Sequence, residues 1–152
     1  MFVEIVERLP TVQEFAFVTA AVGFKAHPPE AIAIGLANSS FSVCAIAAGG
    51  VVGLGRVVGD GALHFSVTGV MVIPEFQRRG IGSRIVEALL SRVKQVPYAN
   101  TLVEALPLPG LEGFLLALRV QSLPSVFSRH APLPRSNRPP CGAATLNGSS
   151  IR

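Results

Sequence analysis

The residues most able to do chemistry in this 152-residue sequence lie between positions 70 and 83. An apolar run is followed by a short loop with Arg78 and Arg79, and Gly80 and Gly82 then open an amphipathic stretch. Amides at a helix N-terminus lack partners and attract phosphate, and glycine lets an anion approach the backbone closely. The segment predicts an anion site of diphosphate size. A glycine-tightened turn with two solvated arginines fits the same residues.

Two other phosphate-binding motifs are excluded. A Walker loop needs Gly-Lys followed by Ser or Thr, and the sequence has no such triplet. Gly53 and Gly55 follow a β-rich run, but Val58 stands where a dinucleotide fingerprint needs a third glycine. We therefore expect these two glycines to mark a strand position where another backbone or a ligand packs closely.

The elements around the loop follow from hydrophobic periodicity. Residues 80–95 predict a helix, because apolar residues recur every three or four positions on one side of it. Ahead of the loop, three β-rich runs cover residues 41–48, 51–58 and 62–73. The glycines at 49–50 and 59–61 supply the positive φ values of tight hairpins, which predicts a three-stranded antiparallel meander.

The flanking segments add helices and strands. Residues 2–8 predict a strand, and a capping box of Thr11 and Glu14 opens a helix to about residue 24. A second helix begins at Pro28-Pro29 and ends near Asn38. A short strand is expected at residues 101–105 and a short helix at residues 111–118.

Charge and composition limit the classes of partner. Residues 1–123 hold nine basic and nine acidic residues, so the net charge of +4 comes from four arginines in residues 124–152. Basic residues scattered through a Pro-rich tail differ from the clustered basic face that nucleic acid requires, so no nucleic-acid partner is expected. We predict a folded domain at residues 1–123 and a tail of loop or disorder at 124–152, with strand character only at 125–128.

Two further partners are not expected. Residues 31–55 are uncharged and long enough to span a bilayer, but polar residues and the glycine pair at 49–50 interrupt them, and they predict a helix end, strand, turn and strand. Two cysteines suffice neither for a disulfide framework nor for a zinc site, so no metal is expected, and Cys44 is predicted to be a core residue. The charged first ten residues are unlike a secretory signal, and a cytoplasmic location is expected.

A family resemblance now becomes specific. Gln77-Arg78-Arg79-Gly80-Ile81-Gly82 resembles the Q/R-x-x-G-x-G/A signature of the GNAT N-acetyltransferase superfamily, and it lies between a strand and a helix as in that family. The preceding strand, two helices and meander are similar too, and residues 113–120 look like a worn version of the family's later helix. The resemblance covers about residues 1–120. It implies an α+β fold, in which helices flank a mixed, mostly antiparallel sheet that splays between the third meander strand and the strand at 101–105.

The resemblance also implies a cosubstrate, acetyl-coenzyme A, and an acceptor, a small-molecule or peptide primary amine that attacks the thioester directly. The loop amides would hold the pyrophosphate, and the edge of the third meander strand would pair with the pantetheine arm. A homodimer is compatible with the family. The residues implied to contact the coenzyme are Val70, Met71, Val72, Gln77, Arg78, Arg79, Gly80, Ile81, Gly82 and Ser83.

A proton acceptor has two candidates. His64 alternates with Ser66 and Thr68 on one face of a strand, which in the resemblance borders the acceptor cleft, and Glu104 ends the neighbouring strand. Both residues are equally compatible with a solvated role.

One departure from the family favours other readings. Leu115 stands where family members commonly carry a tyrosine acid, and Tyr98 is not assigned that role. A non-catalytic acyl-coenzyme A binding module with a degenerate acceptor site is therefore the alternative to an acetyltransferase. A general anion-binding regulatory domain is a third reading.

Overall fold

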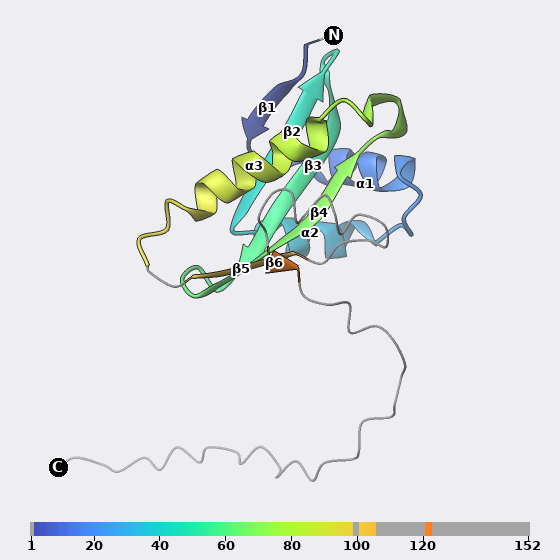
Figure 1. Cartoon of the computed structure of the whole chain (residues 1–152). Coiled ribbons are helices and arrows are strands. Elements are labelled where there is room, and N and C mark those ends of the chain that lie inside the picture. The colour runs from blue at the N-terminus through green and yellow to red at the C-terminus, as the bar shows by residue number, and fades with distance from the viewer. Residues whose placement is uncertain (1, 99–100, 106–120, 123–152) are drawn as a thin grey trace, which may run out of the picture.

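The computed structural model describes residues 2–98, 101–105 and 121–122, and the predicted helix at 111–118, Leu115 and the tail lie outside these ranges. The described elements are β1 (Glu4–Glu7), α1 (Val12–Ala21), α2 (Pro29–Ala37), β2 (Phe41–Ala47), β3 (Gly50–Gly59), β4 (His64–Val72), a 3-10 turn (Pro74–Phe76), α3 (Ile81–Val93), β5 (Leu102–Ala105) and β6 (Gln121–Ser122) (Figure 1). The strands and helices from β1 to β5 follow the predicted order, whereas the 3-10 turn and β6 were not predicted.

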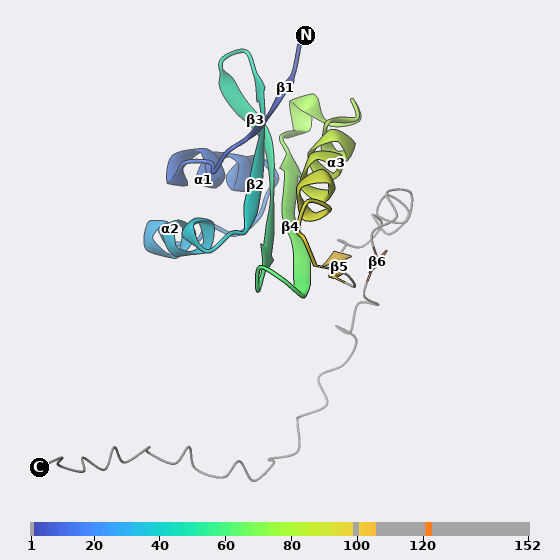
Figure 2. The same cartoon turned by 90° about the vertical axis from the view of Figure 1, so that its left-hand side faces the viewer.

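The described strands form one mixed sheet in the order β1-β2-β3-β4-β5-β6. Strands β1 to β4 pair antiparallel, whereas β5 runs parallel to β4 and β6 parallel to β5. Helices α1 and α2 lie on one face of this sheet and α3 lies on the other (Figure 2). The predicted α+β class, with its meander and flanking helices, is confirmed.

The core lies where α3 packs on the middle strands. Ile81, Ile85, Leu89 and Val93 are buried, as the helical period predicts, and the sheet contributes Phe65, which is fully buried. Gly53 and Gly55 of β3 allow this close approach, because a Cβ at Gly55 would lie 2.6 Å from Ile85 Cγ2. Close packing at these glycines was expected, and the structure shows that the packed partner is α3.

The uncharged stretch at residues 31–55 folds as the end of α2, then β2, a turn and the start of β3. Among the described residues no helix has both the length and the apolar character needed to cross a membrane. Cys44 is buried in β2, and burial raises the pKa of its thiol to about 11. It is a core residue, as expected.

The hairpin turns differ in detail from the prediction. The positive φ values in the first turn belong to Ala48 (49°) and Gly49 (79°), whereas Gly50 already begins β3. The turn is therefore one residue earlier than predicted. In the second turn Gly61 has a φ of 86°, and the Asp60 carboxylate accepts hydrogen bonds from the three amides of residues 62–64.

The start of α1 is fixed by the predicted capping box. Thr11 Oγ1 accepts a hydrogen bond from the Glu14 amide at 3.1 Å, and the Glu14 carboxylate accepts one from the Thr11 amide at 2.7 Å. Arg8, just after β1, donates two hydrogen bonds of 2.8 Å to the same carboxylate. This contact ties the first strand to the first helix.

Glu14 makes the stability of the fold depend on acid pH. The hydrogen bonds from Arg8, followed by those from Thr11, lower the pKa of Glu14 to about 2. Because the folded state binds this proton more weakly than the unfolded chain, the stabilisation is complete above about pH 5 and is lost as the pH falls toward 2. We expect Glu14→Gln to flatten the loss of unfolding free energy over this window in urea titrations. An unchanged pH dependence in the variant would contradict this assignment.

Candidate functional site

The loop between β4 and α3 has an unusual backbone. Arg78 has a φ of 61° and Gly80 a φ of 74°, so two residues of the loop occupy the left-handed region. Gln77 Nε2 donates a 2.8 Å hydrogen bond to the carbonyl oxygen of Val72, which ties the loop to the end of β4. These features turn the chain sharply from the strand into Ile81, the first residue of α3.

The turn leaves a row of backbone donors free. Among the described residues, none accepts a hydrogen bond from the amides of residues 78–83, and the first amide of this region to bond is that of Arg84, to Gly80 O at 3.1 Å. The helix that follows has 13 residues, so its dipole adds positive potential at the same place. Free amides at a helix N-terminus form a binding site for an anion such as phosphate.

Two cations flank these donors. Arg78 and Arg79 are exposed, and the Arg79 guanidinium lies 5.5 Å from the centre of the Phe76 ring. Neither arginine takes part in the three ion pairs of the described residues. Among the described residues no acidic side chain neutralises their charge, and the binding of a diphosphate beside them stays a prediction.

The end of β4 lies next to the loop. In the described part of the chain, the pairing of β4 with β5 covers His64 to Val67 and ends before residue 68. Gly69, with a φ of 60°, lies where the register between β3 and β4 shifts by one residue, which is a β-bulge. The strand thus continues past this bulge, beyond its described pairing with β5, with residues 70–72.

The two candidate proton acceptors are brought together. His64 Nε2 lies 2.8 Å from Glu104 Oε1, across the parallel pairing of β4 and β5. The His64 side chain is 48% exposed and that of Glu104 is 15% exposed, so the pair is accessible from solvent. We expect the residues that alternate with His64, Ser66 and Thr68 to lie on the opposite face of β4. Phe65 and Val67 are buried there, whereas Leu63 precedes the strand and is exposed.

This pair shares a face of the sheet with Arg56 of β3. Thr68 pairs with Arg56 and Ser66 pairs with Glu104, and residues two apart on a strand point to the same side. Arg56 Nη1 donates a 2.8 Å hydrogen bond to the carbonyl oxygen of Gly35 in α2. The shared face is therefore the one covered by α1 and α2.

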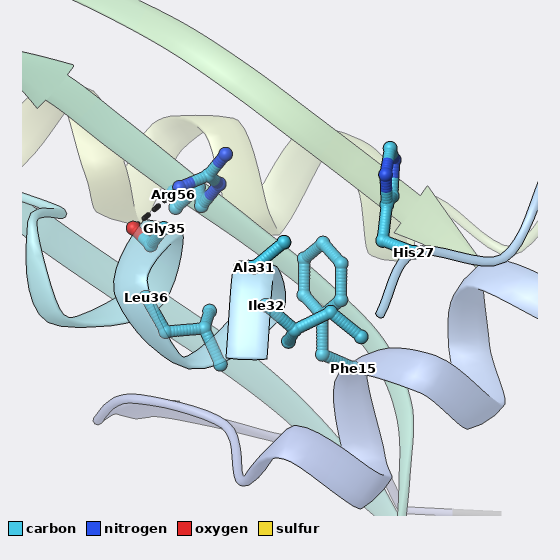
Figure 3. Close-up of a pocket in the computed structure, with 7 residues that line it drawn as sticks. All are labelled: Phe15, His27, Ala31, Ile32, Gly35, Leu36 and Arg56. Carbon is cyan, nitrogen blue, oxygen red and sulfur yellow. Dashed lines mark hydrogen bonds between the residues drawn. The ribbon is translucent and has the colours of Figure 1, made fainter. Parts of the chain in front are cut away.

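An open pocket of about 170 Å³ lies on this face, between α1, α2 and β3 (Figure 3). Arg56 was not among the residues selected from the sequence. The available signal was a single charged residue within a strand otherwise made of valine, leucine and glycine. The lining residues are Phe15, His27, Ala31, Ile32, Gly35, Leu36 and Arg56.

Comparison with known families identifies the domain. Residues 37–109 match the acetyltransferase (GNAT) domain, and this range includes the meander, the loop and α3. Residues 37–109 are thus identified as an acetyltransferase (GNAT) domain by this match. A comparison with curated proteins found no match.

Solved structures agree with the fold of the GNAT domain. A GNAT-family acetyltransferase from Streptococcus pneumoniae has 25% identity and a TM-score of 0.68 over 79% of this chain and 88% of its own. A protein of unknown function from methicillin-resistant Staphylococcus aureus, described as a probable acetyltransferase, has 23% identity and a TM-score of 0.74 over 82% of this chain and 92% of its own. An aminoglycoside N-acetyltransferase in complex with CoA has 16% identity and a TM-score of 0.61 over 86% of this chain and 95% of its own.

Proposed function

We propose that the protein transfers an acetyl group from acetyl-coenzyme A to a primary amine. The observation that carries the proposal is the row of amides at residues 78–83, at the N-terminus of α3, which find no acceptor among the described residues and lie beside two arginines without an ion pair there. A linked pair of phosphates fits this arrangement, because each phosphate accepts several hydrogen bonds and carries negative charge. The related fold that was solved with CoA supports the same assignment.

Each part of the site has a proposed role in binding. The amides from Arg78 to Ser83 hold the pyrophosphate, and Gln77 keeps the loop in place through its bond to Val72 O. The backbone edge of residues 70–72 pairs with the pantetheine arm, beyond the described pairing of β4 with β5 at His64 to Val67. An amide of that edge donates a hydrogen bond to the thioester carbonyl, where negative charge develops during the reaction.

The reaction then requires that the amine and the thioester be held next to each other, and that one proton be removed from the amine. Bound acetyl-coenzyme A supplies the acetyl group as a thioester, whose C–S bond breaks as the amine nitrogen forms the new C–N bond. The amine must be neutral to attack, so its proton passes through water molecules to His64 of the hydrogen-bonded pair with Glu104, because His64 lies six residues before Val70 on β4. The free thiol and the acetylated amine leave.

The proposal is tested by release of free thiol from acetyl-coenzyme A in the presence of a panel of primary amines. We expect release that depends on the amine, together with calorimetric binding of the coenzyme. Coenzyme binding without release for any amine would select the alternative, a non-catalytic acyl-coenzyme A binding module. Binding of other diphosphates but not of coenzyme A would instead select an anion-binding regulatory domain.

The proton-acceptor assignment makes its own prediction. We expect His64→Gln to lower kcat about 100-fold, a typical loss for a general base, while the Kd of acetyl-coenzyme A stays the same. Glu104→Gln should have a smaller effect, because the Glu104 carboxylate orients the imidazole 2.8 Å away. Steady-state kinetics with one acceptor, alongside calorimetry, measures both quantities. A kcat within twofold of the wild type for His64→Gln would remove this residue from the mechanism.

A further inference from the structure

Arg56 is a partly buried cation, and no acidic side chain among the described residues pairs with it. Two arginines of the described residues, Arg8 and Arg92, form ion pairs with glutamates. Arg56 instead donates its hydrogen bonds to neutral groups only. Burial lowers the pKa of Arg56, which reflects the cost of removing this charge from water. A buried cation without an acid is costly unless another partner is supplied.

The hydrogen bonds of Arg56 leave one edge of its guanidinium free. Nη1 donates to Gly35 O at 2.8 Å and to Ser39 Oγ at 3.3 Å. In the described part of the chain no acceptor lies within bonding distance of Nη2, and Nε is buried with no partner. The Nε–Nη2 edge of a guanidinium matches the two oxygens of a carboxylate.

The pocket beside this edge combines donors with an apolar base. Arg56 lies at one end and His27 at the other, with the Phe15 ring and Ile32 between them (Figure 3). The Arg56 guanidinium carbon is 6.0 Å from the centre of the Phe15 ring. No acidic residue is among the seven that line the pocket, so a carboxylate would meet no repulsion from its walls.

The pocket is close to the part of β4 that is assigned to the thioester. Arg56 pairs with Thr68, and a Cβ at Gly69 would lie 3.8 Å from Arg56 Nε. Gly69 forms the bulge just before residues 70–72, the proposed pantetheine edge. A small molecule whose carboxylate binds Arg56 would therefore have its adjacent amino group next to the bulge.

We propose that the acceptor is a small amine with a carboxylate and an apolar body, such as an apolar amino acid, and that Arg56 binds its carboxylate. The apolar body packs on Phe15 and Ile32, and the amino group faces the bulge in β4. This inference rests on the proposed function, because the amino group is the one acetylated: its nitrogen loses a proton and gains the acetyl group as the thiol leaves.

The test compares each amine with a partner that lacks only the charge. Full-length protein is given acetyl-coenzyme A with L-leucine or L-leucinamide, and with L-phenylalanine or its amide. We expect kcat/KM to be at least about tenfold higher for the acids, as a charge-assisted pair provides. Saturation-transfer NMR should show the same preference in binding, whether or not the bound amine is acetylated.

Variants assign the preference to Arg56. We expect Arg56→Gln to raise KM for the acids at least about tenfold, to leave the amides within twofold, and to leave coenzyme binding unchanged. Arg56→Lys keeps the charge but loses the two-donor edge, so it should restore part of the preference. Lys25→Gln removes an exposed charge that forms no ion pair among the described residues, and it should match the wild type.

The outcomes separate this inference from the proposed function. Equal kinetics and equal NMR signals for acids and amides, with the coenzyme bound, would overturn the carboxylate assignment and leave acetyl transfer intact. An acid preference that survives in Arg56→Gln would also overturn it. Failure of the wild type to bind coenzyme A would overturn both.

Discussion

Replacing Gly82 by leucine is expected to raise the Kd of acetyl-coenzyme A by about 100-fold or more. Gly82 is the second residue of α3, within the row of free amides, and a leucine side chain there would occupy the space of the phosphates. Two lost charge-assisted hydrogen bonds are sufficient for an effect of this size. Isothermal calorimetry with coenzyme A measures the change directly.

The same substitution should leave the fold intact. Gly82 is not among the residues with positive φ, and leucine has a higher helix propensity than glycine. The matched control is Ser91→Leu, which adds the same side chain to an exposed position of α3 more than two turns away. Wild-type coenzyme affinity in Gly82→Leu would refute the assignment of the loop, and weakened binding in both variants would show that the effect is not local.

Replacing Gly55 by valine is expected to lower the free energy of unfolding by about 3 kcal/mol, the upper part of the usual range for overpacking. A Cβ at this position would lie 2.6 Å from Ile85 Cγ2 and 3.1 Å from Leu89 Cδ1, and both of these side chains are fully buried. Because α3 cannot move away without opening the core, the strain cannot be relieved locally. Urea unfolding followed by circular dichroism reports the loss.

Gly50→Val provides the matched control in the same strand. Gly50 begins β3, is exposed, and has no atom within 4 Å of its Cβ direction. Since valine favours strands, this variant should be as stable as the wild type or slightly more stable. A loss in Gly50→Val equal to that in Gly55→Val would show that the cause is strand propensity rather than contact with α3.

Much of the fold follows from local patterns. The capping box at Thr11 and Glu14, the apolar stripe of α3 and the glycine-separated β runs each arise from neighbours within a few residues, and each was predicted within about two residues. The turn between β2 and β3 was misplaced by one residue. Glycine is the usual residue for positive φ, but here the pairing of β2 with β3 places Ala48 in that conformation.

In the candidate site, too, some features follow from local sequence and others depend on the tertiary structure. The loop residues from Gln77 to Ser83 are consecutive, so their spacing alone indicates an anion site. His64 and Glu104 are 40 positions apart, and only the parallel pairing of β4 with β5 brings them into contact. Each could be suspected from the sequence, but their joint action could not.

Arg56 shows most clearly what the sequence could not predict. A lone arginine in a strand reads as a solvated edge residue, because a sequence does not state which face a helix will cover. Packing of α1 and α2 over that face buries the guanidinium and provides Gly35 and Ser39 as acceptors for Nη1. The other edge has no partner within the described ranges of the chain. The sequence by itself determined most of the secondary structure and the loop that we propose to bind phosphate, because both depend on contacts short in sequence. The pocket at Arg56 and the His64–Glu104 pair depend on contacts between distant segments, so only the tertiary structure decided them.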